Sequence, residues 1–234
     1  YVLLGYKSSV MLITDYKNTF DRIKLVLLRT PMVVPKWGHV ETVCPPLGLA
    51  YVAASLQQAG YEVSSVDAIG EAPLQRIISE DKNFVNYGLS IEQILQHLAS
   101  KDFNLLFVSL MFSHEWVMTK SIIKTIKKKY PNVILVCGGE HISACPEFCM
   151  KECPEIDVCV FGEGEKTSVD LLKTIEQKRS LSEVSGIVFR SKTYVLVTDI
   201  VVGTLGKRIK PSPETFVMRN PISSSELDIS SLSV

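Results

Sequence analysis

The sequence has no excess of charge of either sign. Its 25 Lys and Arg residues equal its 25 Asp and Glu residues, which gives a formal net charge of +0. Proteins that bind nucleic acid or anionic membranes through their overall charge carry a basic surplus. We therefore expect neither nucleic acid nor a membrane as a partner. The lysines gathered at residues 124–129 are typical of the solvated carboxyl end of a helix.

Long apolar runs and secretory signals are lacking as well. No run approaches the roughly 20 apolar residues that a membrane-spanning helix needs. The first residues, YVLLGYK, do not have the order of a signal peptide. Six cysteines in 234 residues without such a signal predict reduced thiols and a cytoplasmic protein.

What the sequence does contain is a regular alternation of strand and helix patterns. Apolar runs rich in leucine and β-branched residues predict five buried strands, at residues 22–31, 61–70, 104–110, 133–141 and 157–165. The segments between them repeat apolar residues at helical spacing, as at Leu49, Val52, Ala53 and Leu56. This order predicts an α/β fold, a Rossmann-like doubly wound sheet of five parallel strands.

Three segments fall outside this alternation. Residues 71–89 have no clear period and are expected to form a loose insertion. GIVFR and YVLVT, separated by SKT, predict a small C-terminal β-hairpin over residues 186–198. The predicted domains are therefore an N-terminal extension at 1–21, one α/β domain at 22–200, and a linker or tail rich in Pro and Ser at 201–234.

A doubly wound sheet binds its ligand at the carboxyl ends of its strands, and the loops there exclude several common ligands. RTPMVVP after the first predicted strand lacks the G-x-G-x-x-G that a dinucleotide requires. Ser109 ends the third strand, where a phosphoacceptor domain has an aspartate. GEGEKTS is no P-loop, because Glu165 stands where the glycine before Lys166 should be.

Glycine is concentrated at the ends of the fourth and fifth predicted strands. Gly138 and Gly139 follow the fourth strand, and Gly162 and Gly164 follow the fifth. Each group alone is typical of a tight turn. Two such turns at one edge of the sheet, with Ser109 beside them, favour the close approach of a large ligand to the backbone.

Taken in order, these elements resemble the cobalamin-binding domain of cobalamin-dependent radical SAM enzymes. The matching runs are PPLGLAYVAASLQQAGYEVSSVDA, NLLFVSLMFS, VILVCGGEHISACPE and DVCVFGEGEKT, spread over about residues 22–200. The resemblance implies a Rossmann-like fold that binds cobalamin, with the nucleotide tail between the sheet and the helices. The cofactor-binding residues that it implies are Asp67 at the corrin edge, Ser109, Gly138, Gly139, His141, Gly162, Glu163 and Gly164.

Two motifs of related proteins are absent. The D-x-H-x-x-G motif, whose histidine binds cobalt from below, has its nearest counterpart in DAIG at residues 67–70. We therefore predict that no histidine from such a motif ligates cobalt. His141 can instead contact the corrin or the nucleotide, or be a turn histidine bonded to nearby backbone.

The second absent motif is C-x-x-x-C-x-x-C, which holds the four-iron cluster of a radical SAM enzyme. The resemblance places this cluster and S-adenosylmethionine in a barrel domain that this chain lacks, joined in cis or supplied in trans. The expected function is cobalamin binding for a radical SAM methyltransferase, with no catalytic residue and no turnover by this chain alone. The alternatives are a stand-alone cobalamin carrier or sensor, and a flavodoxin-like domain without cobalamin.

CPEFCMKEC, at residues 145–153, resembles a cluster motif but has its third cysteine one residue late. A spacing of four places Cys145, Cys149 and Cys153 along one stripe of a helix, with Pro146 in its first turn. Such a stripe favours packing against the sheet over a zinc or iron–sulfur site. We therefore expect no metal ligand in this chain.

Overall fold

The computed structural model describes residues 22–38, 43–79, 82–190, 194–198, 200–202, 207–209 and 218–219. The predicted extension at 1–21 and most of the predicted tail at 201–234 lie outside these residues, so both domain boundaries stay predictions. Within the described ranges, no helix combines the length and the apolar character needed to cross a membrane.

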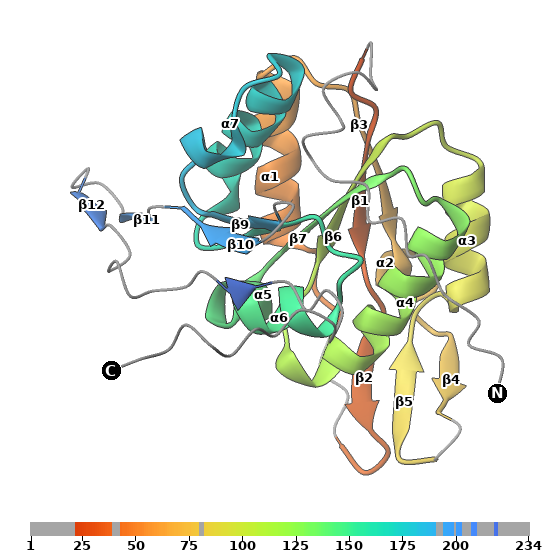
Figure 1. Cartoon of the computed structure of the whole chain (residues 1–234). Coiled ribbons are helices and arrows are strands. Elements are labelled where there is room, and N and C mark those ends of the chain that lie inside the picture. The colour runs from red at the N-terminus through yellow and green to blue at the C-terminus, as the bar shows by residue number, and fades with distance from the viewer. Residues whose placement is uncertain are drawn as a thin grey trace, which may run out of the picture.

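Five parallel strands form the centre of the molecule (Figure 1), as predicted. Across the sheet they are β3 (Val63–Asp67), β1 (Leu25–Arg29), β6 (Leu105–Ser109), β7 (Ile134–Gly138) and β8 (Val158–Val160). β1 pairs with both β3 and β6, so the chain winds first to one side of β1 and then to the other. The switch point of this doubly wound sheet therefore lies at the carboxyl end of β1, where such folds bind ligands.

Antiparallel strands extend the sheet beyond β8. β9 (Ile187–Arg190) pairs with β8, and β10 (Tyr194–Val197) pairs with β9, which confirms the predicted hairpin. β13 (Met218–Arg219) adds to β10, and β11 (Ile200–Val202) pairs with β12 (Lys207–Ile209) in a separate ribbon. The hairpin is thus part of the main sheet, which reaches eight strands.

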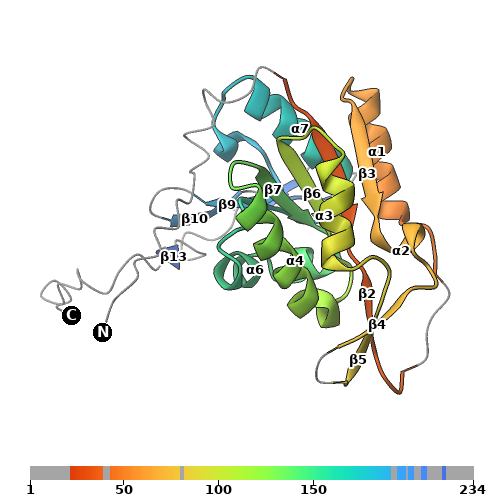
Figure 2. The ribbon, with the colours of Figure 1, turned by 90° about the vertical axis from the view of Figure 1, so that its right-hand side faces the viewer.

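Helices cover both faces of the sheet (Figures 1 and 2). One face carries α1 (Leu47–Gln58) and α7 (Gly164–Glu176), and the other carries α3 (Ile91–Ala99), α4 (Trp116–Lys129) and α6 (Pro146–Glu152). The shorter helical segments are α2 (Ala68–Glu71), η2 (Ser113–Glu115), α5 (Glu140–Ala144) and η3 (Leu181–Glu183).

Alternating strand residues explain why two helical layers form. Leu25 and Leu27 point to one face and pack in a cluster with Leu56 of α1, whereas Val26 and Leu28 point to the other face. All of these side chains are at most 3% exposed. Full burial of each contributes about 1.5–3 kcal/mol, so neither face is stable without its helices.

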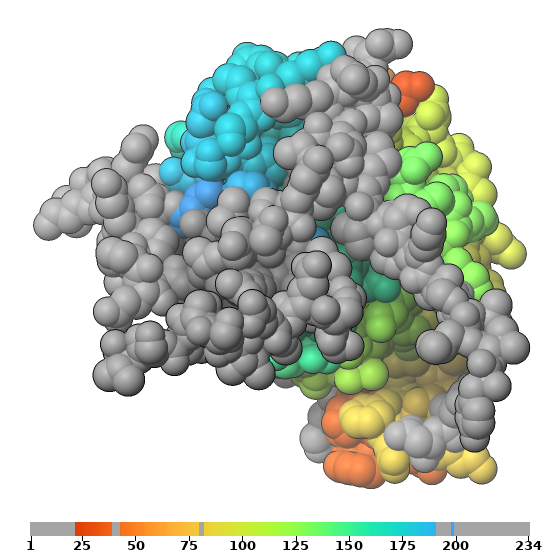
Figure 3. All heavy atoms as spheres, viewed as in Figure 1, coloured from red at the N-terminus to blue at the C-terminus, as the bar shows by residue number. Residues whose placement is uncertain are grey.

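The segment expected to be a loose insertion is ordered, which corrects the prediction. β4 (Arg76–Ile78) and β5 (Phe84–Tyr87) pair with each other, and β5 also pairs with β2 (Met32–Pro35). This small antiparallel sheet projects beyond the carboxyl edge of the main sheet, at the bottom of Figure 1, and in orange and yellow in Figure 3. Its strands are too short to show a local pattern. The pairing of β2 with β5 also joins segments about 50 residues apart in sequence.

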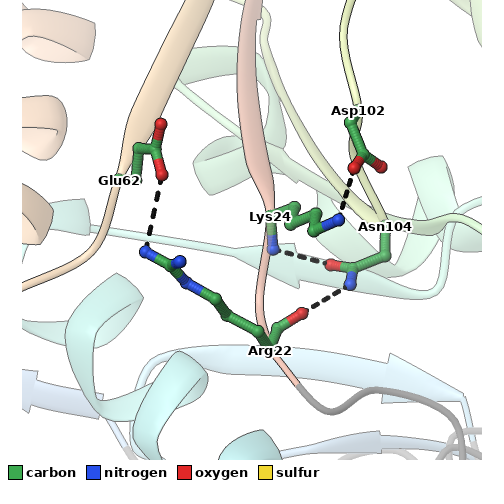
Figure 4. Close-up of polar contacts among 5 residues, drawn as sticks. All are labelled: Arg22, Lys24, Glu62, Asp102 and Asn104. Atoms are coloured by element: carbon green, nitrogen blue, oxygen red, sulfur yellow. Dashed lines mark hydrogen bonds and ion pairs between the residues drawn. The ribbon is translucent and has the colours of Figure 1, made fainter.

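Polar side chains fasten the amino end of the sheet (Figure 4). Asn104 Oδ1 accepts a hydrogen bond from the Lys24 backbone N–H at 3.0 Å, and its Nδ2 donates to the Arg22 carbonyl at 2.8 Å. Lys24 also pairs with Asp102, and Arg22 with Glu62. These contacts fix the start of β1 against its neighbours.

The lysine-rich end of α4 differs in one residue from the solvated end that was predicted. Lys127 is largely buried, and its Nζ donates to the Val133 carbonyl at 2.6 Å and to Asp157 Oδ2 at 2.8 Å. The same Asp157 oxygen accepts from the Leu135 backbone N–H at 2.8 Å. This buried pair ties α4 to β7 and to the start of β8.

The cysteine stripe packs as predicted for two of its three members. α6 begins at Pro146, and Cys145 and Cys153 flank the helix. Cys149 and Cys153 are fully buried in the core between the sheet and the helices, whereas Cys145 is only partly buried. Burial, with the neighbouring Cys145 thiol, raises the pKa of Cys149 to about 12.

Candidate cofactor site

A cavity of about 560 Å³ lies at the carboxyl edge of the main sheet. The ends of β1, β6, β7 and β8 form its floor, and the amino ends of α1 and α7 form a wall. Its volume falls in the range of small-molecule sites. The residues on which the following description depends are Arg29, Leu47, Val52, Ser109, Met111, Phe112, Glu115, Gly138, Gly139, Glu140, Ser143, Gly162, Glu163 and Gly164.

Six of the eight residues predicted to bind a cofactor line this cavity. They are Ser109, Gly138, Gly139, Gly162, Glu163 and Gly164. They reach it from three segments that are distant in sequence, because the parallel strands all end at the same edge. Their contact with a cofactor stays a prediction.

The register of the sheet places several of these residues in one row. Asp67 is paired with Arg29, Arg29 with Ser109, and Ser109 with Gly138. The row crosses four neighbouring strands at their last residues. It explains why a strand-end aspartate, serine and glycine that are far apart in sequence belong to one edge.

Two of the glycines have positive φ angles, for different reasons. Gly139 has φ +109°, and a Cβ atom there would overlap the Leu110 carbonyl group, so glycine is required by the protein's own packing. Gly162 has φ +73°, yet a Cβ atom there would meet nothing within 4 Å. Its backbone N–H donates to Ser143 Oγ at 3.0 Å, which joins the two glycine turns. The space beside Gly162 is therefore open to a ligand.

Asp67 is placed just outside the cavity lining. Its Oδ1 accepts hydrogen bonds from the backbone N–H groups of Ile69 and Gly70 at 3.1 and 2.9 Å, which caps α2. Its Oδ2 lies 3.4 Å from Arg29 Nη1. Asp67 thus positions Arg29, which does line the cavity.

His141 lies on α5, directly after the loop that follows β7, and is not part of the described cavity lining. Its ring is buried, and its Nδ1 lies 2.9 Å from Ser113 Oγ. The ring also packs against Trp116, with centroids 5.5 Å apart. Burial lowers the pKa of His141. Of the two alternatives left open for His141, the structure shows a ring bonded to the side chain of Ser113, and a contact with a cofactor stays a prediction.

Sequence reasoning missed Glu115. It is 6% exposed and lines the cavity. Burial raises its pKa from 4.5 to about 7, although backbone hydrogen bonds at Phe112 and Val33 and the charge of Arg29 act in the opposite direction. The local sequence Ser113-His114-Glu115 contains no signal of a buried acid. The available signal was its position shortly after the third strand, at the ligand-binding edge.

No histidine is among the cavity-lining residues in the part of the chain that the structure describes. His114 stacks on Phe112, with ring centroids 5.5 Å apart, and Phe112 itself lines the cavity. His39 lies outside the described residues. The described walls therefore offer apolar side chains, backbone groups, hydroxyl groups, one cation and several carboxyl groups, of which Glu115 is largely buried.

Known proteins share both sequence and fold with this chain. A family model described as B12 binding domain matches residues 37–172, more than half of the chain. Cytidylyl-2-hydroxyethylphosphonate methyltransferase of Streptomyces wedmorensis is 28% identical over 172 residues, which cover 73% of this chain and 32% of that protein.

Two further relatives match shorter parts. The cobalamin-dependent radical SAM methyltransferase TokK of Streptomyces tokunonensis is 34% identical over 98 residues, which cover 39% of this chain and 14% of that protein. An anaerobic magnesium-protoporphyrin IX monomethyl ester cyclase of Synechocystis is 27% identical over 158 residues, which cover 66% and 28%. The chain therefore spans about a third or less of the length of these curated relatives.

Solved structures share the fold. The radical S-adenosylmethionine methyltransferase TsrM from Kitasatospora setae, with cobalamin and a [4Fe-4S] cluster bound, matches with a TM-score of 0.58 and 18% identity over 82% of this chain and 32% of that chain. OxsB with aqua-cobalamin and S-adenosylmethionine bound matches with a TM-score of 0.53 and 18% identity over 81% and 22%. The family match over more than half of the chain is decisive, and the chain belongs to the B12-binding domain family.

Proposed function

We propose that this chain binds cobalamin at the carboxyl edge of its sheet and is the cofactor domain of a radical SAM methyltransferase. The observation that carries the proposal is the overlap of the family match with the cavity. Residues 37–172 include the amino ends of α1 and α7, Ser109 and both glycine turns.

The shape and lining of the cavity fit this cofactor. Cobalamin is larger than 560 Å³, so the cavity would hold only part of it, and we assign that part to the nucleotide tail. Leu47, Met111 and Phe112 line the cavity yet are between 49% and 66% exposed, so together they form an apolar surface that a bound ligand could cover. They would pack against the apolar face of the corrin, and the open side of Gly162 would let the nucleotide tail approach the backbone.

Ser109 and Arg29 would supply polar contacts at the floor of the cavity. Both end their strands in the same row, and the Arg29 guanidinium is fixed by Asp67. When bound, cobalamin would supply a cobalt centre able to carry a methyl group. The chain's own contribution is to bind and orient the cofactor and to shield part of it from water.

We also propose that no histidine from a D-x-H-x-x-G motif reaches cobalt. The segment in that position, DAIG, forms α2, and the Asp67 carboxylate caps it. Electron paramagnetic resonance of the cobalt(II) form tests this proposal. Because the base of cobalamin also has a nitrogen that can bind cobalt, the chain's histidines are labelled with nitrogen-15. We expect a spectrum that the label does not change, and a change of the hyperfine splitting with the label would show that a protein histidine binds cobalt.

Turnover requires a second component in this proposal. S-adenosylmethionine and an iron–sulfur cluster are named for relatives that are at least three times as long as the segment matched here. We place both in a barrel domain, joined in cis or supplied in trans. Methyl transfer is favoured because relatives at 28% and 34% identity are methyltransferases.

Titration of the reduced protein with hydroxocobalamin tests the binding step. We expect a change in the corrinoid absorption spectrum that saturates at one cofactor per chain at micromolar concentration. Absence of binding under these conditions would contradict the proposal. Methyl transfer that appears only on addition of a cluster-bearing barrel would separate a methyltransferase domain from a stand-alone carrier or sensor.

A further inference from the structure

A second site lies beside the loop that follows β7, outside the cavity lining. We propose that His141, Cys145 and Cys149 form a zinc site. Their ligand atoms all lie within 4.8 Å of one another. Nothing in the proposed cobalamin function requires this cluster, so it is an independent inference.

The distances within the cluster suit a tetrahedral ion. Cys145 Sγ lies 3.7 Å from His141 Nδ1 and 3.8 Å from Nε2. Zinc bonds of about 2.3 Å to sulfur and 2.0–2.1 Å to nitrogen, at a tetrahedral angle, place these two ligand atoms about 3.6 Å apart. The Cys145 thiol is therefore about as far from the imidazole nitrogens as a shared ion requires, but it is almost equidistant from both, so the imidazole ring or the thiol must rotate to bring Nε2 and Sγ onto one ion.

The local fold explains why the three side chains meet. His141 lies on α5, Cys149 lies on α6, and Cys145 is the residue between the two helices. A spacing of four residues repeats from His141 to Cys145 and from Cys145 to Cys149, which keeps all three on one side of the turn. Cys153 continues this spacing, but its Sγ donates to Glu155 Oε2 at 3.3 Å and is not part of the cluster.

A neighbouring hydroxyl group orients the histidine. With Nδ1 protonated and donating to Ser113 Oγ at 2.9 Å, Nε2 is left to bind a metal. Metal-binding histidines in proteins are commonly oriented in this way by a partner on the second ring nitrogen. Ser113 lies on η2, 28 residues upstream, so the contact depends on the tertiary fold.

The ligand types favour zinc. One imidazole and two thiols are a typical set for Zn²⁺, with a water molecule as the fourth ligand. Binding releases the two thiol protons to solvent, so the ion and its two thiolates sum to zero charge, which suits a buried position. Cys145 is only partly buried and gives the ion a route from solvent.

The site would brace one wall of the cofactor cavity. α5 begins directly after Gly139 and carries Glu140 and Ser143, both of which line the cavity. A zinc ion would fasten α5 to α6 from the opposite side. The expectation of no metal ligand came from treating the three cysteines as one packing stripe, whereas the fold combines two of them with His141.

Titration of the chelator-treated, reduced full chain with Co²⁺ and then Zn²⁺ tests the site in the absence of cobalamin. We expect one Co²⁺ per chain, with the intense near-ultraviolet bands of thiolate ligation, and displacement by one Zn²⁺. Cys145→Ser and His141→Gln should each weaken zinc binding at least 100-fold. Cys153→Ser, which removes the next thiol of the same stripe, should leave it unchanged.

Two outcomes would overturn the site. One is the absence of thiolate bands in the wild-type chain, and the other is equal loss of metal binding in Cys153→Ser and Cys145→Ser. Circular dichroism of each variant without metal shows whether it folds. If His141→Gln does not fold, Cys145→Ser, at the partly exposed position, decides the question.

Discussion

The two sides of the loop that follows β7 are built in different ways. On the cavity side, the contacts that matter involve the backbone, because Gly139 packs on the Leu110 carbonyl and Gly162 leaves an open space. On the opposite side, the contacts are between the side chains of His141, Ser113 and Cys145. Where backbone packs directly on backbone, as at Gly139, there is no room for an added atom, whereas a cluster made of side chains depends on keeping its donor atoms.

The largest effect is expected where the backbone wall is closest. Gly139→Ala should lower the free energy of unfolding by about 3 kcal/mol or more, because a Cβ atom at φ +109° would overlap the Leu110 carbonyl. Gly138→Ala is the matched control, since its Cβ atom would only reach ordinary contact with the Val160 carbonyl oxygen at 3.7 Å. Urea denaturation of both variants checks this, and equal losses would refute the difference between the two neighbours.

The next effect concerns the side-chain cluster. Ser113→Ala should weaken the proposed zinc binding by about 10–100-fold, because it removes the partner that orients His141. Ser143→Ala, which removes the hydroxyl bonded to the Gly162 N–H on the cavity side, should leave zinc affinity unchanged. Zinc competition titrations of the two variants measure the contrast, and a larger loss in Ser143→Ala would reverse our assignment of the two sides.

Glu115 gives the cavity side a pH dependence. Because its pKa is raised from 4.5 to about 7 in the folded chain, the folded state holds this proton more tightly than the unfolded state does. Its stabilising contribution is complete below about pH 4.5 and is lost as the pH rises through about 7. Glu115→Gln imitates the protonated form. Its free energy of unfolding should therefore match that of the wild type at pH 5 and exceed it by about 1–3 kcal/mol at pH 8.

Urea denaturation between pH 5 and 8 measures this difference. Glu140→Gln, which removes an exposed carboxyl group from the same cavity edge, is the matched control and should show no comparable trend. A constant difference between wild type and Glu115→Gln across this range would mean that Glu115 is ionised throughout in the folded chain.

The smallest effect is expected at Asp67. Asp67→Ala should cost about 1 kcal/mol of stability through the lost cap of α2, and Asp67→Asn should cost less because an amide oxygen can still accept from Ile69 and Gly70. Thermal unfolding measures both. If Asp67 contacts the corrin, both variants will also weaken cobalamin binding directly. If Asp67 only positions Arg29, cobalamin binding will weaken only to the extent that the contact between Asp67 and Arg29 is lost.

Much of the fold could be predicted from local patterns. The five strands, their helices and the hairpin each have a periodicity that is visible within about ten residues of sequence. The sheet of β2, β4 and β5 could not be predicted, because its strands are three or four residues long and β2 pairs with β5 across some 50 residues. The buried role of Lys127 was missed for a similar reason, since its partner Asp157 lies 30 residues away.

The site follows the same division. Glycine and serine at strand ends are local signals, and the parallel sheet brings them to one edge without further information. Glu115 and the contact of Ser113 with His141 depend on how the loop after β6 lies against its neighbours, which no local pattern encodes. His141 follows Gly139 and Glu140, which line the cavity, but is not itself among the described lining residues, and its contact with a cofactor stays a prediction.

Cobalamin titration of two glycine variants tests the central claim most directly. Gly162 and Gly60 both have positive φ, +73° and +92°, and both have open space around an added Cβ atom, but only Gly162 lines the cavity. Gly162→Leu should weaken hydroxocobalamin binding at least tenfold, and Gly60→Leu should bind as the wild type does. Equal affinities for the two variants would contradict binding of the cofactor at this edge of the sheet.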